Sequence, residues 1–401
     1  MPKENFSKKF GISAKSAVAN IILISNAFVW YSFAFSILKS IIDEPELVIW
    51  CIHFIGATFS ALVGAKLADK IRKKTTFISL WMLFGMLSSL TLVNASLINS
   101  YAWVIFLIFG ISFGLGLPTS LGYFAECTII ENRAKIGGLI LLFNGIGAFL
   151  LGITPITEIT LQALTLAIWR GLGLIFFLTI KPTQTVPKRV TSVSFTYILS
   201  QHSFLFYLIP WIMFSLVNYL SAPVFSIRDA NLFRVLVTIE NALMGVFAVL
   251  GGFFSDIVGR KRITITGFIL LGLGYAALGI YPENLFSWYF YALVDSIAWG
   301  IFSVIFIFTI WGDLSYGASS DKYYAVGGLP FFLSNFLRLT IGSYIAETIS
   351  AYAIFSFAAF FLFLAVVPLM FAPETLPEKS LRERELRQYI EKAKKIKEKY
   401  V

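Results

Sequence analysis

Long apolar stretches recur along the whole chain, separated by short breaks that carry charges, Pro, Asn or Ser. Each stretch is about 18 to 25 residues long, the length that an α-helix needs to cross the hydrocarbon of a bilayer. The pattern predicts twelve transmembrane helices, at 17–40, 47–68, 75–95, 102–125, 136–156, 161–180, 203–225, 232–254, 263–281, 286–311, 323–345 and 349–371. We therefore expect an all-α membrane protein.

Composition agrees with the pattern and excludes several classes of protein. Hydrophobic residues make up 58% of the chain and charged residues 13%, whereas soluble domains carry roughly 25% charged residues. The sequence has two His and two Cys, no phosphate-cradling loop after a strand and no pair of metal-ligand motifs. We expect no enzymatic activity, no cofactor, no metal and no ATP-driven pump.

The basic residues orient the predicted helices. With the amino terminus placed in the cytoplasm, most of the 32 Lys and Arg residues fall on the inner side, while the outer loops carry Asp and Glu. Both termini are then cytoplasmic, in a multi-pass protein of the plasma membrane. The net charge of +10 is explained by topology, so we expect the lipid bilayer and not nucleic acid as a partner.

The longest polar interruption divides the chain in two. Residues 181–202, with Pro182, Pro187, Lys188 and Arg189, read as a cytoplasmic linker between six-helix halves at 1–180 and 203–371. The tail at 372–401 is charged, with apolar residues at helical spacing, which predicts a basic amphipathic helix on the inner leaflet. We expect a monomer.

Charged landmarks repeat between the halves. Asp69 and Asp256 lie 187 residues apart at corresponding turns, and Glu126 and Asp313, each at the end of a span, have the same separation. Two parallel six-helix repeats that alternate access to a site between them are a known plan for transporters.

The turn after the eighth span resembles the cytoplasmic signature of the major facilitator superfamily. Gly252, Asp256, Gly259 and Arg260 complete the signature, whereas its first copy keeps Asp69 but has other residues at most positions. The resemblance implies a cytoplasmic latch that favours the outward-facing state, in which acids and cations hold helix ends together. Its candidate residues are Asp69, Arg72, Lys73, Glu126, Arg133, Gly252, Asp256, Gly259, Arg260 and Asp313.

Other motifs are similar to the metabolite:proton symporters and sugar porters of this superfamily. The first span, from Asn26 to Phe33, resembles a stretch that carries two carboxylates in those symporters, but Val29 and Ser32 occupy the carboxylate positions. Glu126 with Arg133, and Pro373-Glu374-Thr375 after the last span, resemble sugar porters. The resemblance thus implies the fold, while the proton-binding acids expected in the first half are missing.

Three ionisable residues of the second half are expected at similar membrane depth. Glu240, Asp295 and Arg338 each lie several residues inside their spans, about 10–14 Å below the outer surface. If they meet, they form a site for substrate and proton, or alternatively an ion-pair network that closes the outer gate. His53 corresponds to Glu240 across the repeat and is a candidate for coupling or, alternatively, a packing residue.

Uncharged polar and aromatic side chains supply further candidates for a central ligand site. The candidates for substrate binding are Asn26, Trp30, Tyr31, Asn144, Trp211, Asn218 and Arg338. Arg170, which follows Trp169, is interpreted as structural.

The sequence therefore predicts a secondary active transporter that moves a small organic metabolite by alternating access, with proton symport as the energy source. Arg338 favours a carboxylate over a neutral sugar. A facilitative uniporter and a transporter-like receptor that moves no solute remain alternatives. Drug/proton antiport is disfavoured because Asn144-Gly145-Ile146-Gly147 contains no Pro.

Overall fold

The chain is almost entirely helical over the part that the structure describes. The computed structural model describes residues 12–42, 47–71, 73–152, 156–180, 191–228, 230–315 and 317–377. Its helices are α2 (Ala14–Ile41), α3 (Leu47–Ala68), α4 (Lys74–Leu90), α5 (Ala95–Gly114), α6 (Leu117–Cys127), α7 (Arg133–Gly152), α8 (Ile159–Ile180), α9 (Phe195–Ser200), α10 (His202–Arg228), α11 (Ala230–Val258), α12 (Arg260–Ile280), α13 (Leu285–Phe302), α14 (Ile310–Leu314), α15 (Ser320–Thr340), α16 (Gly342–Thr348), α17 (Ala351–Leu364) and α18 (Val366–Phe371). Each of the twelve predicted spans coincides with one of these helices or with a consecutive pair.

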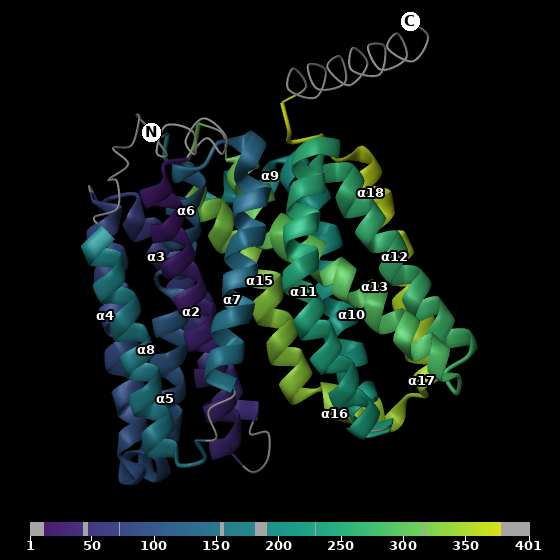
Figure 1. Cartoon of the computed structure of the whole chain (residues 1–401), viewed down its shortest axis with the longest axis horizontal. Coiled ribbons are helices and arrows are strands. Elements are labelled where there is room, and N and C mark those ends of the chain that lie inside the picture. Colours follow the sequence, from purple (N-terminus) through teal and green to yellow (C-terminus); the bar gives the residue numbers. More distant parts are fainter. Residues whose placement is uncertain are drawn as a thin grey trace, which may run out of the picture.

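The apolar helices have the length of membrane spans. Among the described residues, nine helical segments are long and apolar enough to cross a membrane, and two shorter apolar helices lie at His202–Asn218 and Leu243–Val258. Figure 1 shows them as two bundles, α2 to α8 and α10 to α18. The bundles meet where α7 packs on α11 and where α15 packs on α3 and α6. The predicted all-α membrane fold is confirmed.

Several of the predicted spans are not continuous α-helices. The predicted helix 102–125 breaks between α5 and α6 at Gly116, where a Cβ atom would lie 2.2 Å from the ring of Trp81. Trp81 Nε1 donates to the carbonyl of Ser112 at 2.5 Å, so this indole takes an acceptor from the last turn of α5. The predicted helix 286–311 contains a π-helical segment, η3 (Ser303–Thr309), between α13 and α14.

Close approach of the two bundles depends on glycine. At the α7–α11 contact, a Cβ on Gly138 would lie 2.4 Å from the carbonyl oxygen of Ala248, and a Cβ on Gly252 would lie 2.3 Å from that of Ala134. Neither backbone could approach so closely with a larger residue. This seam lies beside the site described below.

Lys- and Arg-containing turns gather at one end of both bundles, called here the basic end; it contains the start of α2, the α3–α4 turn and the segment after α18. Part of the predicted linker forms α9, while residues 181–190 lie outside the described residues. The predicted tail helix also lies outside them from residue 378 onward.

Candidate functional site

A cavity of about 200 Å³ lies between the two bundles. Residues of α2, α3, α5, α6 and α7 face residues of α10, α11, α13, η3, α14 and α15 across it. Its wall consists of Phe28, Ser32, Ala61, Phe113, Leu117, Pro118, Leu121, Leu141, Asn144, Trp211, Met244, Trp299, Ser303, Phe306, Ile307, Trp311, Tyr324, Ala325, Gly327, Gly328, Phe331 and Phe332. Both halves of the chain therefore contribute residues to the wall of the cavity.

Aromatic rings dominate this wall. Trp211 stacks on Phe306 with ring centroids 4.9 Å apart and an interplanar angle of 18°, and its Nε1 donates to the carbonyl of Gly327 at 3.0 Å. The Tyr324 hydroxyl is occupied by the carbonyl of Phe308, to which it donates at 2.5 Å, so the amide and hydroxyl side chains that remain are Asn144, Ser32 and Ser303. Asn144 Oδ1 is buried and has no hydrogen-bond partner among the described residues. None of the lining residues carries a charge, so the cavity suits an uncharged ligand with an aromatic or apolar surface.

Two of the predicted substrate-binding residues, Asn144 and Trp211, line this cavity, and two others face the interior of the first bundle. Trp30 is fully buried, stacks on Phe109 and donates to Ser89 Oγ at 2.8 Å. Asn26 donates to the carbonyl of Trp169 at 2.7 Å and accepts from Arg170 at 2.8 Å. The polar atoms of Trp30 and Asn26 are thus used in hydrogen bonds that hold α2 against α4 and α8.

Tyr31 and His53 form a second contact inside the first bundle. The His53 Nδ1 atom lies 2.9 Å from the carbonyl oxygen of Phe106, and its Nε2 atom lies 2.9 Å from the hydroxyl of Tyr31. A carbonyl oxygen only accepts, so Nδ1 carries a proton. His53 is a fully buried ring with a hydrogen-bond partner at each nitrogen.

Glu240 of α11 and Asp295 of α13 lie on two helices that pack against each other, and their carboxyl groups interact electrostatically. Tyr291 donates a hydrogen bond to Asp295, and the hydroxyls of Tyr291 and Tyr275 are 3.3 Å apart. Each acid lies one helical turn from a cavity-lining residue of its own helix, because Met244 follows Glu240 by four positions and Trp299 follows Asp295 by four.

Arg338 does not join these acids, so the three residues that the sequence places at similar depth do not form one cluster. Its Nη2 donates to Asn335 at 3.1 Å, and it forms no ion pair within the described part of the chain. Similar depth did not bring Arg338 to the acids, because α15 packs against α3, α6 and α10 while the acids lie between α11 and α13. Arg338 and Asn218 are also absent from the cavity wall.

Ion pairs join the two bundles at the basic end, and Asp313 is the centre of one group. Asp313 forms an ion pair with Arg133 of the first bundle and accepts from Arg260 Nε at 3.2 Å. Arg260 also pairs with Asp256, and donates across the seam to the carbonyl of Ile130 at 2.6 Å. The backbone of Lys135 donates to Asp256 at 2.8 Å, so this group contains three links between the halves.

A second group joins the predicted acids Asp69 and Glu126 to Lys74, Asp321 and Lys322, which the sequence analysis did not choose. Lys74 pairs with Glu126 and, across the seam, with Asp321 at 2.6 Å. Lys322 pairs with Asp69 of the other half at 2.5 Å. Lys74 therefore holds the position expected for Lys73, and no ion pair involves Lys73 among the described residues. Arg72 lies outside them.

Asp69 is the latch acid that lies in a turn between spans. Burial alone would raise the pKa of Asp69, but hydrogen bonds from Lys322, Ser319 and Ser192 outweigh that effect and hold the pKa below its usual value. The Ser192 hydroxyl donates at 2.9 Å. The carboxylate thus gathers donors from the other half and from the segment before α9.

The signature glycines have separate structural roles. Gly252 permits the α7–α11 contact described above, while Gly259 has φ of 117° and a Cβ there would lie 2.4 Å from Glu374. Glu374 accepts from the backbone N–H groups of Arg260 and Lys261 at 2.9 and 3.2 Å and so caps α12. The Pro-Glu-Thr segment after α18 is therefore part of the latch, since Thr375 also donates to Asp313.

The latch residues missed by the sequence analysis had a signal. Ser320 occupies the position where the repeat expects a cation, and Lys322, two residues further on, supplies it. Asp321 lies between them and pairs with Lys74. The cavity residues Phe28, Trp299 and Trp311, which the sequence analysis missed, had no such signal. The chain contains 41 Phe and 9 Trp, so nothing in the sequence distinguishes an aromatic residue of the cavity wall from the many that pack elsewhere.

Solved structures with the same architecture identify the fold. A proton:xylose symporter matches over 90% of this chain and 95% of its own, at 15% identity and a TM-score of 0.64. The human organic anion transporter MFSD10 matches over 88% and 99%, at 14% identity and a TM-score of 0.68. The E. coli fucose:proton symporter matches over 90% of this chain and 100% of its own, at 12% identity and a TM-score of 0.67.

No family model and no curated protein sequence matches the chain. At 12–15% identity, these matches identify the fold that the chain shares with the three transporters. The fold is that of the major facilitator superfamily, as the sequence motifs predicted.

Proposed function

We propose that this protein is a secondary active transporter that carries a small organic molecule through the central cavity by alternating access, with protons as the coupling ion. The observation that carries the proposal is the placement of Glu240 and Asp295 one turn from the cavity wall. Two interacting carboxyls share protons readily, because ionising one disfavours ionising the other. A ligand that displaces Met244 or Trp299 acts directly on the same two helices.

The division of contacts supports alternating access. The cavity is lined by both halves, and the ion pairs that cross the seam among the described residues lie at the basic end. Rocking that breaks these pairs would open the cavity toward that end. The excess of basic residues favours a cytoplasmic position for this end in a plasma-membrane protein. With that orientation, the described state is closed to the cytoplasm.

The cavity wall favours an uncharged ligand over the carboxylate expected from Arg338. A carboxylate needs a cation or several donors when it leaves water, and the wall supplies Ser32, Asn144 and Ser303. The printed names of the similar structures, xylose and fucose symporters and an organic anion transporter, span both classes.

The experiment is uptake into proteoliposomes, after a thermal-stabilisation screen of neutral, sugar-like and carboxylate compounds has selected ligands. We expect uptake to exceed the external concentration only under an inward proton gradient. Glu240→Gln should abolish this accumulation while leaving ligand exchange. Gradient-independent uptake in the parent protein would indicate the uniporter, and binding without flux in every variant would indicate a receptor.

His53→Gln is the matched control, since it alters an ionisable group of the first bundle that lies apart from the acid pair. Accumulation that survives Glu240→Gln but not His53→Gln would overturn the assignment of the coupling site.

A further inference from the structure

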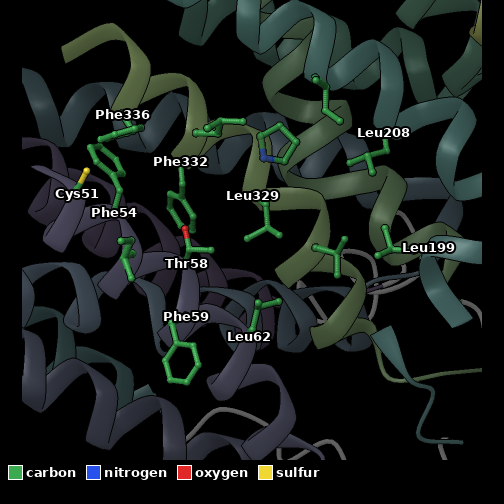
Figure 2. A pocket seen from close by; sticks show the side chains of 15 residues that line it. Cys51, Phe54, Thr58, Phe59, Leu62, Leu199, Leu208, Leu329, Phe332 and Phe336 are labelled. Atoms are coloured by element: carbon green, nitrogen blue, oxygen red, sulfur yellow. The ribbon is translucent and has the colours of Figure 1, made fainter. Parts of the chain in front are cut away.

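A second, larger hollow lies on the outside of the molecule, along the contact between α3 and α15. Its volume is about 660 Å³, and Figure 2 shows its side chains converging from α3, α15 and the start of the second bundle. We call this hollow the α3–α15 groove. It is lined by Cys51, Phe54, Ile55, Thr58, Phe59, Leu62, Leu199, Leu208, Ile212, Val326, Leu329, Pro330, Phe332, Leu333 and Phe336.

The groove lies at the depth of the hydrocarbon. Its α3 residues run from Cys51 to Leu62, about 17 Å along the helix axis, within the span Leu47–Ala68. Phe59 and Ile55 are 68% and 66% exposed on its rim. Thr58 supplies the one hydroxyl, and no charged residue lines the groove. Lipid tails or an apolar solute are the molecules that such a surface accepts from a bilayer.

A single layer of residues separates the groove from the central cavity. On α15, Gly327, Gly328 and Phe331 line the cavity, whereas Leu329 and Pro330 line the groove. Phe332 lines both. On α3 the division falls between Ala61, on the cavity side, and Leu62, on the groove side.

The partition is a weak part of α15. Pro330 lies inside the helix and has no N–H to donate to the carbonyl of Val326, so one backbone hydrogen bond of the turn is missing. Gly328 would have no atom within 4 Å of an added Cβ, which leaves free space beside the backbone. Phe332 packs edge-on against Phe113, with centroids 5.9 Å apart.

We propose that the α3–α15 groove is a lateral portal through which an uncharged, hydrophobic ligand passes from the bilayer into the central cavity, with Phe332 as the gate. The groove and the cavity share this residue, and both have uncharged, largely apolar walls. This inference narrows the substrate class of the proposed transporter to uncharged, hydrophobic molecules. It rests on the proposed function only for what happens to the ligand after it has entered the cavity. Entry itself can be measured without transport.

The experiment uses thiol labelling of the full chain in proteoliposomes, because the sequence has only two cysteines, Cys51 and Cys127. The cavity reporter is Ser32→Cys in a Cys51→Ser, Cys127→Ser background. The groove reporter is the native Cys51 with Cys127→Ser. One reagent is neutral, apolar N-phenylmaleimide preloaded into the lipid, and the other is a sulfonate-bearing maleimide added from water.

We expect the lipid-borne reagent to label the cavity reporter at least tenfold faster than the sulfonated reagent does. Phe332→Trp should slow that labelling tenfold or more and leave labelling of Cys51 unchanged, whereas Phe332→Ala should speed it. Leu87→Trp on the lipid-exposed face of α4 is the matched control and should change neither rate.

Equal labelling of the cavity reporter by both reagents would overturn the proposal, since it would show entry from water. An unchanged rate in both Phe332 variants would overturn it as well. Neither outcome depends on transport, so failure of the portal and failure of the proposed transport function are distinguishable. Matching thermal unfolding profiles establish that each variant is folded.

Discussion

Neutralising Asp313 should release the closed basic end. Asp313 is 5% exposed and is the carboxylate that pairs with Arg133 across the seam. Arg260 keeps Asp256 when Asp313 is changed, but Arg133 is left with Thr128 and backbone carbonyls. Asp313→Asn therefore weakens the closed state mainly through the link between the two halves.

The size of the effect follows from the burial of the pair. Removing one partner of a buried ion pair costs about 3–5 kcal/mol, and the lower figure applies because the carboxamide keeps an acceptor oxygen. At about 1.4 kcal/mol per tenfold change, a cost of about 3 kcal/mol raises the open population roughly 100-fold, provided that Arg133 becomes hydrated on opening.

The assay measures the labelling rate of a cysteine buried in the seam. Ser320 is 5% exposed and contacts the carbonyl of Gly122 in the other half at 3.5 Å, so Ser320→Cys without the native cysteines reports opening. A water-soluble maleimide should label it roughly 100-fold faster after Asp313→Asn. Glu158→Gln, which removes an exposed carboxylate at the opposite end, is the control. A rate within twofold of the parent, in a folded variant, would refute the reasoning.

Three further predictions concern stability, measured as thermal unfolding in detergent. The pKa of Asp69 is held below its usual value, so this carboxylate stabilises the folded state above the unfolded pKa of about 3.9 and loses the effect as the pH falls through the folded pKa. Asp69→Asn should therefore reduce the loss of thermal stability on acidification. An unaltered dependence of the unfolding temperature on pH would contradict this prediction. Gly252→Ala should cost about 1–3 kcal/mol by overpacking, whereas Gly245→Ala, on the same helix with 3.5 Å of room, should cost little; equal effects would argue against the close contact. Asn26→Leu should cost about 1.5–3 kcal/mol because it removes a hydrogen bond to a buried cation. Arg170→Met, which removes a guanidinium with two unpartnered nitrogens, should be tolerated better; the reverse order would be inconsistent with this account.

The positions of the spans could be predicted from the sequence because the bilayer imposes a length on every apolar run. The predicted boundaries of 47–68 coincide with those of α3, whereas the π-helical segment at Ser303–Thr309 has no Gly or Pro to announce it. Hydropathy reports that a segment is buried in apolar surroundings but not how its backbone is hydrogen-bonded.

The direction in which each helix faces was harder to predict, and the first span illustrates why. Asn26 and Trp30 are four residues apart and face the interior of the first bundle, while Phe28 and Ser32, also four apart, face the cavity. Both pairs obey helical spacing. A helix that is apolar on all sides carries no periodic signal that distinguishes the two faces.

The sequence predicted where the charged residues of the latch lie better than it predicted which residues pair with each other. The repeat identified where acids and cations gather, because corresponding turns occur at the same end of two parallel halves. Which cation meets which acid depends on helix tilt and side-chain reach, so Lys74 takes the place expected for Lys73, and Asp321 and Lys322 complete the second-half pairs.

The π-helical segment gives the stretch from α13 to α14 a mechanical property. Asp295 precedes η3, Ser303 and Phe306 lie within it on the cavity wall, and Asp313 follows it. A π turn holds one residue more than the α-helical turn, so returning it to α-helix would rotate everything beyond it by about 100°. One continuous helical stretch thus connects Asp295, the cavity wall and the ion pairs of Asp313 at the basic end. The π-helical segment within it is the point at which the two flanking helices could rotate relative to each other.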